Sequence, residues 1–158
     1  MDQTQLSPEP MTEAQMPETS MAAMAMAVAA FAQAPLRVEV DQLELEGGVD
    51  PAYGSVRWRT LFCADRTQTS GMVVGVAEFG PGGTLLPHRH APAEVYFCLE
   101  GAAVVTVNGI ANPMAPGVAV YVPGNAEHST VAGPDGFRLL YMFAQDRFSD
   151  IEYHFSPL

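Results

Sequence analysis

The feature that most constrains the fold of this chain is the regular interruption of short β-type runs by glycine and proline. From residue 36 onward, runs rich in valine, threonine and aromatic residues are separated by turn-forming pairs such as Pro116-Gly117 and Pro123-Gly124. This punctuation predicts many short antiparallel strands, as in a β-sandwich or β-barrel. The expected strands span residues 36–45, 55–63, 72–79, 84–90, 94–99, 102–107, 118–122, 127–131, 137–143 and 151–155.

The Asn108-Gly109 pair gives the strongest local signal for a hairpin. It follows the alternating run Val104-Val105-Thr106-Val107. Both central positions of a two-residue hairpin turn need positive φ, which asparagine and glycine adopt most easily. We therefore expect the chain to reverse there.

The first 35 residues have a different composition. Residues 1–18 are rich in proline and polar side chains, whereas residues 20–31 are rich in alanine and methionine and predict a helix that ends before Pro35. The alternative is a secretory signal, but the preceding segment carries only acidic charge. We expect a cytoplasmic protein with an N-terminal tail and helix over residues 1–35 and one β domain over residues 36–158.

The charge of the chain excludes several kinds of partner and chemistry. It has 158 residues, 18 acidic and 7 basic, with a net charge of −11 and no lysine. Lysine Schiff-base chemistry and Walker-type phosphate loops are therefore absent, and neither nucleic acid nor an anionic membrane is expected as a partner. The two cysteines, Cys63 and Cys98, are expected to be reduced. The expected ligand is therefore a small neutral or cationic molecule.

Three of the four histidines lie between residues 88 and 128. His88 and His90 are two apart, so in a strand their imidazoles share one face. Glu94 and Tyr96 share a face of the next run, and His128 belongs to a later strand. Three imidazoles and a carboxylate suit a borderline divalent metal such as Fe(II), Mn(II), Zn(II), Ni(II) or Co(II).

The spacing of these residues resembles two motifs of the cupin family. Five residues separate Gly82 from His88, one separates His88 from His90, three separate His90 from Glu94, and six separate Glu94 from Gly101. Gly117, Pro123 and His128 resemble the second motif, although Asn125 and Ala132 depart from it. The resemblance implies an all-β fold, a single cupin jelly-roll β-barrel with an N-terminal helical extension. It also implies that His88, His90, Glu94 and His128 bind a metal, with Fe(II) as our first choice.

The reaction is suggested by Tyr96, two residues after Glu94. A nearby divalent cation favours a phenolate, which could take a proton from a substrate. This arrangement and the C-terminal strand resemble the small cupin dimethylsulfoniopropionate lyases. In these enzymes the tyrosine that matches Tyr96 starts a β-elimination that releases dimethyl sulfide and acrylate. The resemblance therefore implies a carbon–sulfur lyase that acts on a small zwitterion.

Other functions stay open at this point, because a fold alone does not choose a reaction. They are an Fe(II) dioxygenase or isomerase of another small molecule and a non-enzymatic ligand-binding cupin.

Trp58 is expected either to line the mouth of the barrel or to pack against the helix. Tyr141 and Phe143, or instead Leu140 and Met142, are expected to face the core. His154 is expected at the surface or at an interface, and a homodimer is expected as the assembly.

Overall fold

The computed structural model describes residues 20–26 and 35–157. The chain divides into two compact units, Met1–Arg37 and Val38–Leu158. In the first unit residues 20–26 are helical, which agrees with part of the predicted helix; residues 1–18 and 27–31 lie outside the described residues. Within the described parts of the chain, the structure has no helix that is long and apolar enough to cross a membrane.

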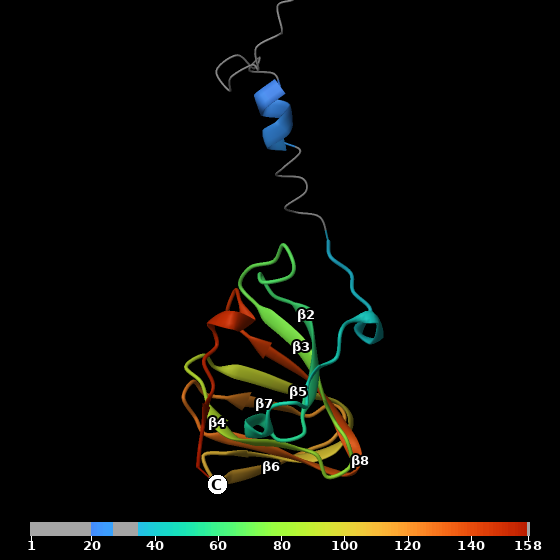
Figure 1. Cartoon of the computed structure of the whole chain (residues 1–158), viewed down its shortest axis with the longest axis vertical. Helices are drawn as coiled ribbons and strands as arrows, with labels where there is room; N and C mark the ends of the chain where they lie inside the picture. Colours follow the sequence, from blue (N-terminus) through green and yellow to red (C-terminus); the bar gives the residue numbers. More distant parts are fainter. Residues whose placement is uncertain (1–19, 27–34, 158) are drawn as a thin grey trace, which may run out of the picture. The chain divides into compact units, whose positions relative to one another are not determined.

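The second unit is a curled antiparallel sheet with three short 3-10 turns (Figure 1). The elements are η2 (Val40–Gln42), β1 (Glu46–Gly47), η3 (Pro51–Tyr53), β2 (Arg57–Phe62), β3 (Val73–Phe79), β4 (Thr84–Arg89), β5 (Glu94–Val107), β6 (Ile110–Met114), β7 (Ala119–Val122), β8 (His128–Phe143), η4 (Phe148–Asp150) and β9 (His154–Phe155). The strand order is β1-β2-β3-β8-β4-β9, and β5 pairs with β6, β7 and β8. This mostly β architecture agrees with the predicted cupin barrel.

Two long strands make the sheet curl around its core. β8 pairs with β5 along most of its length, with β4 through its first residues and with β3 through its last. Every second side chain of β3 and β8 faces inward: Val73, Ala77 and Phe79 on β3 and Phe137, Leu139, Tyr141 and Phe143 on β8 are all buried. This period of two creates one apolar interior that the two halves of the sheet share.

The structure confirms the predicted hairpin and revises several strand boundaries. Val107 pairs with Ile110, and Asn108 and Gly109 have φ values of 47° and 78°. The expected strands at residues 94–99 and 102–107 form one strand, β5, and those at residues 127–131 and 137–143 form one strand, β8. Glycines that predicted turns therefore mark bends inside longer strands, where the register shifts.

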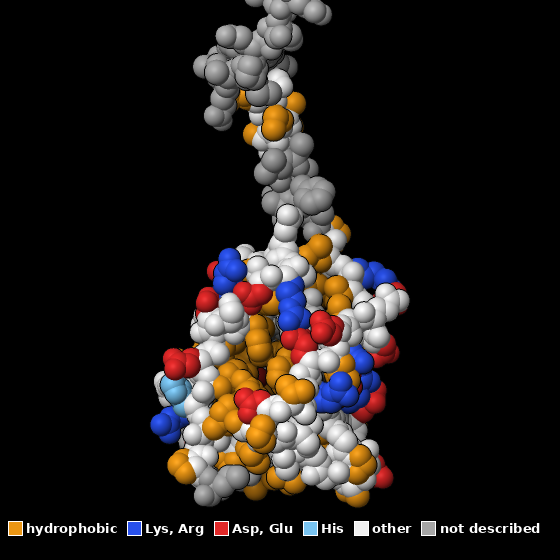
Figure 2. Space-filling view, in the orientation of Figure 1, with side chains coloured by type: hydrophobic (Ala, Val, Ile, Leu, Met, Phe, Trp, Pro, Cys, Tyr) orange, Lys and Arg blue, Asp and Glu red, His pale blue; other side chains and the backbone are white. Residues whose placement is uncertain are grey.

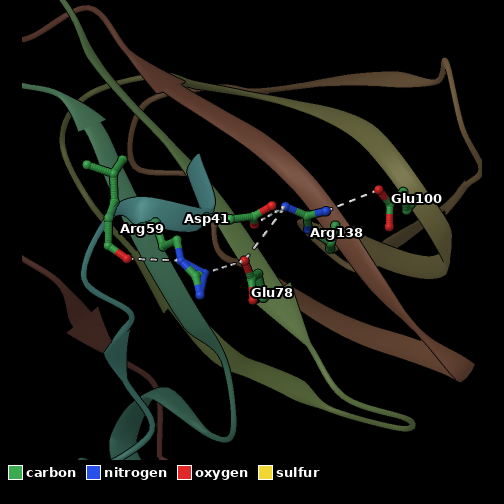
Figure 3. Close-up of polar contacts among 6 residues, drawn as sticks. Asp41, Arg59, Glu78, Glu100 and Arg138 are labelled. Atoms are coloured by element: carbon green, nitrogen blue, oxygen red, sulfur yellow. Dashed lines mark hydrogen bonds and ion pairs between the residues drawn. The ribbon is translucent and has the colours of Figure 1, made fainter. Parts of the chain in front are cut away.

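The predicted strand at residues 36–45 is wrong. This segment contains the turn η2, and Arg59 Nε on β2 donates to the carbonyl of Leu43, just after that turn, at 3.2 Å. Figure 3 shows the adjoining charged contacts, in which Arg59 pairs with Glu78 at 3.0 Å and Arg138 with Glu100 at 3.1 Å. The backbone of residues 36–45 therefore pairs with no strand, although the segment contains β-forming residues. Polar contacts at Asp41 and Leu43 hold it instead.

Gly101 is required where β5 bends. Its φ is +75°, and a Cβ at this position would lie 2.2 Å from the Gly136 carbonyl oxygen. We expect Gly101→Ala to lower the free energy of unfolding by more than about 2 kcal/mol, since it combines a left-handed backbone with a clash against main chain. Urea denaturation measures this change.

Gly109→Ala is the matched control for that substitution. Gly109 also has positive φ, +78°, but nothing lies within 4 Å of its Cβ position. We expect only the conformational cost, about 1 kcal/mol. Equal losses for the two variants would show that the contact with Gly136 does not constrain the bend.

Candidate metal centre and substrate cavity

Three histidine side chains meet inside the barrel. His88 on β4 pairs directly with His128 on β8, and His90 follows at the end of β4. Each is at most 1% exposed, and one ring nitrogen from each lies within 4.8 Å of the others. The spacing of two residues therefore brings His88 and His90 to a common point, and the β4–β8 pairing brings His128 there.

Backbone hydrogen bonds fix which nitrogen of each ring faces this point. The Nδ1 atoms of His88, His90 and His128 lie 2.8, 2.9 and 2.9 Å from the carbonyl oxygens of Leu86, Pro92 and Ala126. Because a carbonyl can only accept, each Nδ1 carries a hydrogen, so Nε2 is the nitrogen that offers a lone pair when the ring is neutral. All three Nε2 atoms are buried without a hydrogen-bond partner.

A carboxylate oxygen of Glu94 lies beside two of the three imidazoles. Its Oε2 lies 3.3 Å from His90 Nε2 and 3.4 Å from His128 Nε2, and it too is buried without a hydrogen-bond partner. With neutral rings, the lone pairs of the three Nε2 atoms converge, and the Glu94 oxygen faces two of them, which is unfavourable unless a cation lies between these atoms. The donor set fits a divalent transition metal, with the backbone carbonyls orienting the imidazoles.

The pKa shifts of His88 and Glu94 predict that acid destabilises the metal-free protein. Burial, followed by repulsion from His128, lowers the pKa of His88 from 6.5 to about 3. Burial alone raises the pKa of Glu94, but its contacts with His128 and His90 outweigh burial and lower it. The unfolded chain therefore binds more protons than the folded chain below about pH 6.5.

We expect the free energy of unfolding of the metal-free protein to fall as the pH drops from about 6.5 toward 3, with His88 alone contributing up to about 1.4 kcal/mol per pH unit. Above pH 6.5 this contribution is constant. Urea denaturation of chelator-treated protein at a series of pH values checks the slope. A free energy that is flat between pH 6.5 and 4 would contradict the buried, neutral state of His88.

A cavity opens beside this cluster, with Glu94 and Tyr96 in its wall. Figure 2 shows a hollow among hydrophobic side chains on the face of this unit where η3 lies in Figure 1. The other lining residues are Tyr53, Val56, Trp58, Ala77, Phe79, Leu85, Leu139, Tyr141, Phe148 and Tyr153. Glu94 is the only charged residue among the described residues in this wall, and the remaining surface is largely aromatic or aliphatic.

Tyr96 lies where the sequence predicts it, on the inward face of β5. It is 3% exposed, as is Glu94, whereas Phe97 on the opposite face is 39% exposed. Burial and then the charge of Glu94 raise the pKa of Tyr96 well above 10. The phenol is therefore neutral unless a positive charge near Glu94 stabilises the phenolate.

The structure adds cavity residues that the sequence does not single out. Tyr153 stacks on His88, with ring centroids 5.1 Å apart, and also contacts His90 edge-on at 5.3 Å. Tyr53 packs against Tyr153 and Trp58 at 5.4 and 5.6 Å. No metal-binding motif contains Tyr53 or Tyr153: in the sequence Tyr53 is an aromatic residue just before the expected strand at 55–63, and Tyr153 lies inside the expected strand at 151–155.

The structure also shows where the other residues considered in the sequence lie. Trp58 lines the cavity. Tyr141 and Phe143 face inward, as the first of the two alternatives predicts, but Tyr141 belongs to the cavity wall as well as to the core. The side chain of His154 is 53% exposed and lies outside the histidine cluster. Cys63 and Cys98 are buried and free, as expected.

Comparison with known proteins agrees with this arrangement. Residues 75–143 match the model of the cupin domain. The polyketide cyclase RemF from Streptomyces resistomycificus superposes with a TM-score of 0.67 and 22% identity, over 79% of this chain and 87% of that one. A chain from the crystal structures of the dimethylsulfoniopropionate lyases RdDddP and RnDddQII gives a TM-score of 0.62 and 22% identity, over 73% and 63% of the two chains. At these identities the likenesses show the fold.

One relative is much more similar in sequence. The dimethylsulfoniopropionate lyase DddW of Ruegeria pomeroyi is 50% identical over 122 residues, which cover 77% of this chain and 80% of that protein. An uncharacterized protein of Streptomyces coelicolor is 34% identical over 73 residues, or 46% of this chain and 70% of that protein. The chain therefore belongs to the cupin family and, within it, to the family of the Ruegeria pomeroyi protein.

Proposed function

We propose that this protein is a metal-dependent carbon–sulfur lyase that cleaves dimethylsulfoniopropionate to dimethyl sulfide and acrylate. One observation carries the proposal: Tyr96 and Glu94 share a small aromatic cavity beside three imidazoles whose Nε2 atoms are buried and unpartnered. The 50% identity to DddW, whose name states this activity, supports the choice of reaction.

The chemistry of the cavity wall suits a sulfonium zwitterion. Aromatic faces attract a desolvated cation, and Tyr53, Trp58, Phe148 and Tyr153 supply such faces. The buried carboxylate of Glu94 adds negative charge, and none of the described lining residues is an arginine. A cationic dimethylsulfonio group is therefore favoured over an anionic group at the aromatic end of the cavity.

We assign the metal ligands to His88, His90, Glu94 and His128, and Fe(II) is our first choice of metal. Mn(II), Zn(II), Ni(II) and Co(II) are the alternatives, because imidazole and carboxylate donors accept all of these ions. Such an ion supplies positive charge that attracts the substrate carboxylate and favours deprotonation of neighbouring groups. The buried, preoriented Nε2 atoms and the carboxylate of Glu94 are this chain's part in that chemistry.

Tyr96 is the proposed base. Its phenolate oxygen takes a proton from the carbon next to the substrate carboxylate, the electron pair forms the C=C bond of acrylate, and the C–S pair leaves with dimethyl sulfide. The step needs no oxidant, so it differs from an oxygenase reaction in its products and in its independence of O₂. Burial of Tyr96 keeps bulk water away from the abstracted proton.

We also propose a homodimer. Phe97 and Leu99 on β5 and Tyr121 on β7 are 39%, 38% and 64% exposed on the outer face of the sheet. Val95 pairs with Tyr121, and Phe97 with Ala119, so these side chains form one apolar surface that a second copy would cover. Sedimentation at micromolar concentration tests the assembly, and a monomer mass would overturn it.

The test of the proposed function is release of dimethyl sulfide into the headspace. Chelator-treated protein is reloaded with Fe(II), Mn(II), Zn(II), Ni(II) or Co(II) and incubated with dimethylsulfoniopropionate with and without O₂. We expect equal amounts of dimethyl sulfide and acrylate in both atmospheres. Loaded protein that releases neither product, or that turns over only with O₂, would overturn the proposal.

A further inference from the structure

Gly75 leaves a gap in the inward-facing row of side chains on β3. The row repeats every second residue, and its other members, Val73, Ala77 and Phe79, are all buried. Gly75 lies between Val73 and Ala77 and is buried too, but it has no side chain to fill its place. A glycine inside a strand weakens the strand and often marks a point where another group approaches closely.

The ring of Tyr141 takes the place that a side chain at Gly75 would occupy. Tyr141 on β8 pairs directly with Gly75. A Cβ at Gly75 would lie 2.2 Å from the Tyr141 hydroxyl oxygen and 2.3 Å from Cζ. Because these two distances are nearly equal, the Cζ–O bond lies side-on to the Cβ position. The outer end of the ring therefore lies along the surface of β3.

A hydroxyl group on β2 holds the outer end of the Tyr141 ring. Thr60 pairs with Gly75, and Thr60 Oγ1 lies 3.5 Å from the Tyr141 hydroxyl oxygen, a long hydrogen bond. Thr60 Oγ1 itself donates to Glu46 Oε1 at 3.1 Å, so its single hydrogen is used and it accepts from Tyr141. A partner two strands away from β8 thus orients this phenol.

Tyr141 lies one inward row further from the histidine cluster than Glu94 does. Glu94 pairs with Phe143, and the Phe143 ring lies 5.0 Å from the ring of His90. The next inward pair along these two strands is Tyr96 with Tyr141. Successive inward rows are about 7 Å apart. A small substrate whose carboxylate lies at the histidine cluster therefore extends its other end toward the row of Tyr141.

The cavity has little space to spare. Its volume is about 40 Å³, which is room for only a few water molecules. Tyr141 and its neighbours Ala77 and Leu139 belong to the wall. If the ring of Tyr141 were raised from β3, it would occupy space that is now open to a substrate.

We propose that Gly75 and Tyr141 together set the size of the group that the cavity accepts at the end away from the histidine cluster; this inference rests on the proposed lyase function. Gly75 lets the phenol lie along β3, which keeps room for the dimethylsulfonio group. A larger group on sulfur meets the ring of Tyr141. A side chain at position 75 raises that ring into the cavity and excludes the dimethylsulfonio group as well.

Tyr141→Leu tests the size limit, because leucine keeps an apolar inward side chain and lacks the outer part of the ring. Acrylate release is measured from dimethylsulfoniopropionate and from its diethylsulfonio analogue. We expect the unmodified protein to prefer the dimethyl substrate at least about tenfold in kcat/KM, and this preference should fall at least about fivefold in Tyr141→Leu. A loss of stability alone lowers both kcat/KM values by the same factor, so their ratio reports the size limit.

Gly75→Ala tests the other half of the pair. It should raise the KM for dimethylsulfoniopropionate at least about fivefold, because the ring of Tyr141 must leave β3. A Cβ at Gly75 would also lie 2.7 Å from the Arg59 carbonyl oxygen, and the double variant Gly75→Ala/Tyr141→Leu separates the two contacts. Gly75→Ala should change KM by less than about twofold when residue 141 is already leucine, since leucine leaves the space that the new Cβ needs.

Gly80→Ala is the matched control. Gly80 directly follows β3, its φ lies outside the left-handed region, and nothing lies within 4 Å of its Cβ position. This variant should keep both kcat/KM values of the unmodified protein.

An unchanged preference in Tyr141→Leu would overturn the inference, and this variant decides the matter if Gly75→Ala does not fold. Equal kcat/KM values for the two substrates in the unmodified protein would overturn it too. So would a rise in KM from Gly75→Ala that is the same with leucine at residue 141, because the cause would then be the Arg59 carbonyl. If the unmodified, metal-loaded protein releases acrylate from neither substrate, the proposed function fails and the inference fails with it.

Discussion

Replacing His128 with alanine is expected to remove the bound metal and to lower dimethyl sulfide release by more than about a thousandfold, the equivalent of several kcal/mol of charge stabilisation. The Nε2 atom of His128 is one of the four proposed ligand atoms that are buried without a hydrogen-bond partner, and the histidine cluster holds no further imidazole among the described residues. Metal analysis and headspace measurement on the same preparation give both quantities.

His154→Ala is the matched control for that substitution, because it also removes an imidazole. His154 is 53% exposed, and its nearest acidic oxygen is 4.0 Å away on Glu152. This variant should keep full metal content and activity. If His128→Ala instead kept one metal per chain, the assignment of His128 as a ligand would be wrong.

Tyr96→Phe is expected to lower kcat by about a thousandfold, within the usual range for loss of a general base, and to leave metal content unchanged. The substitution removes one oxygen from a residue that is 3% exposed and leaves its ring in the core. A loss of turnover at unchanged metal content would show that the Tyr96 hydroxyl acts in the reaction and not in metal binding. Loss of metal together with activity would identify Tyr96 as a ligand or as a support for the ligands.

Tyr121→Phe provides the comparison on the outer face of the sheet. Tyr121 is 64% exposed, and it belongs to neither the cavity nor the histidine cluster. Its kcat should equal that of the unmodified protein. A loss of turnover in Tyr121→Phe similar to that in Tyr96→Phe would mean that the inner phenol has no special role.

The candidate site could be predicted from the sequence where local geometry determines it. The spacing of two between His88 and His90, and the shared face of Glu94 and Tyr96, follow from the period of a strand. The hairpin at Asn108-Gly109 follows from the φ values that its turn requires. Each of these features depends on residues that are close in the sequence.

Features that depend on distant residues could not be predicted in the same way. The stacking of Tyr153 on His88 and the passage of Tyr141 over Gly75 both result from pairing between strands far apart in the sequence. The segment at residues 36–45 has β-forming residues but no strand partner, so tertiary contacts override its propensity. Gly101 resembles a turn residue in the sequence, and only its approach to Gly136 shows that it bends a continuous strand.

The most direct test of the account is to measure metal content and lyase activity together while metal-free protein is titrated with Fe(II). Initial rates of dimethyl sulfide release are followed in parallel with bound metal, without O₂. The account predicts that activity rises in proportion to bound metal and stops rising at one ion per chain, with no rise for His128→Ala. Full activity in the metal-free protein, or no activity in the fully loaded protein, would contradict it.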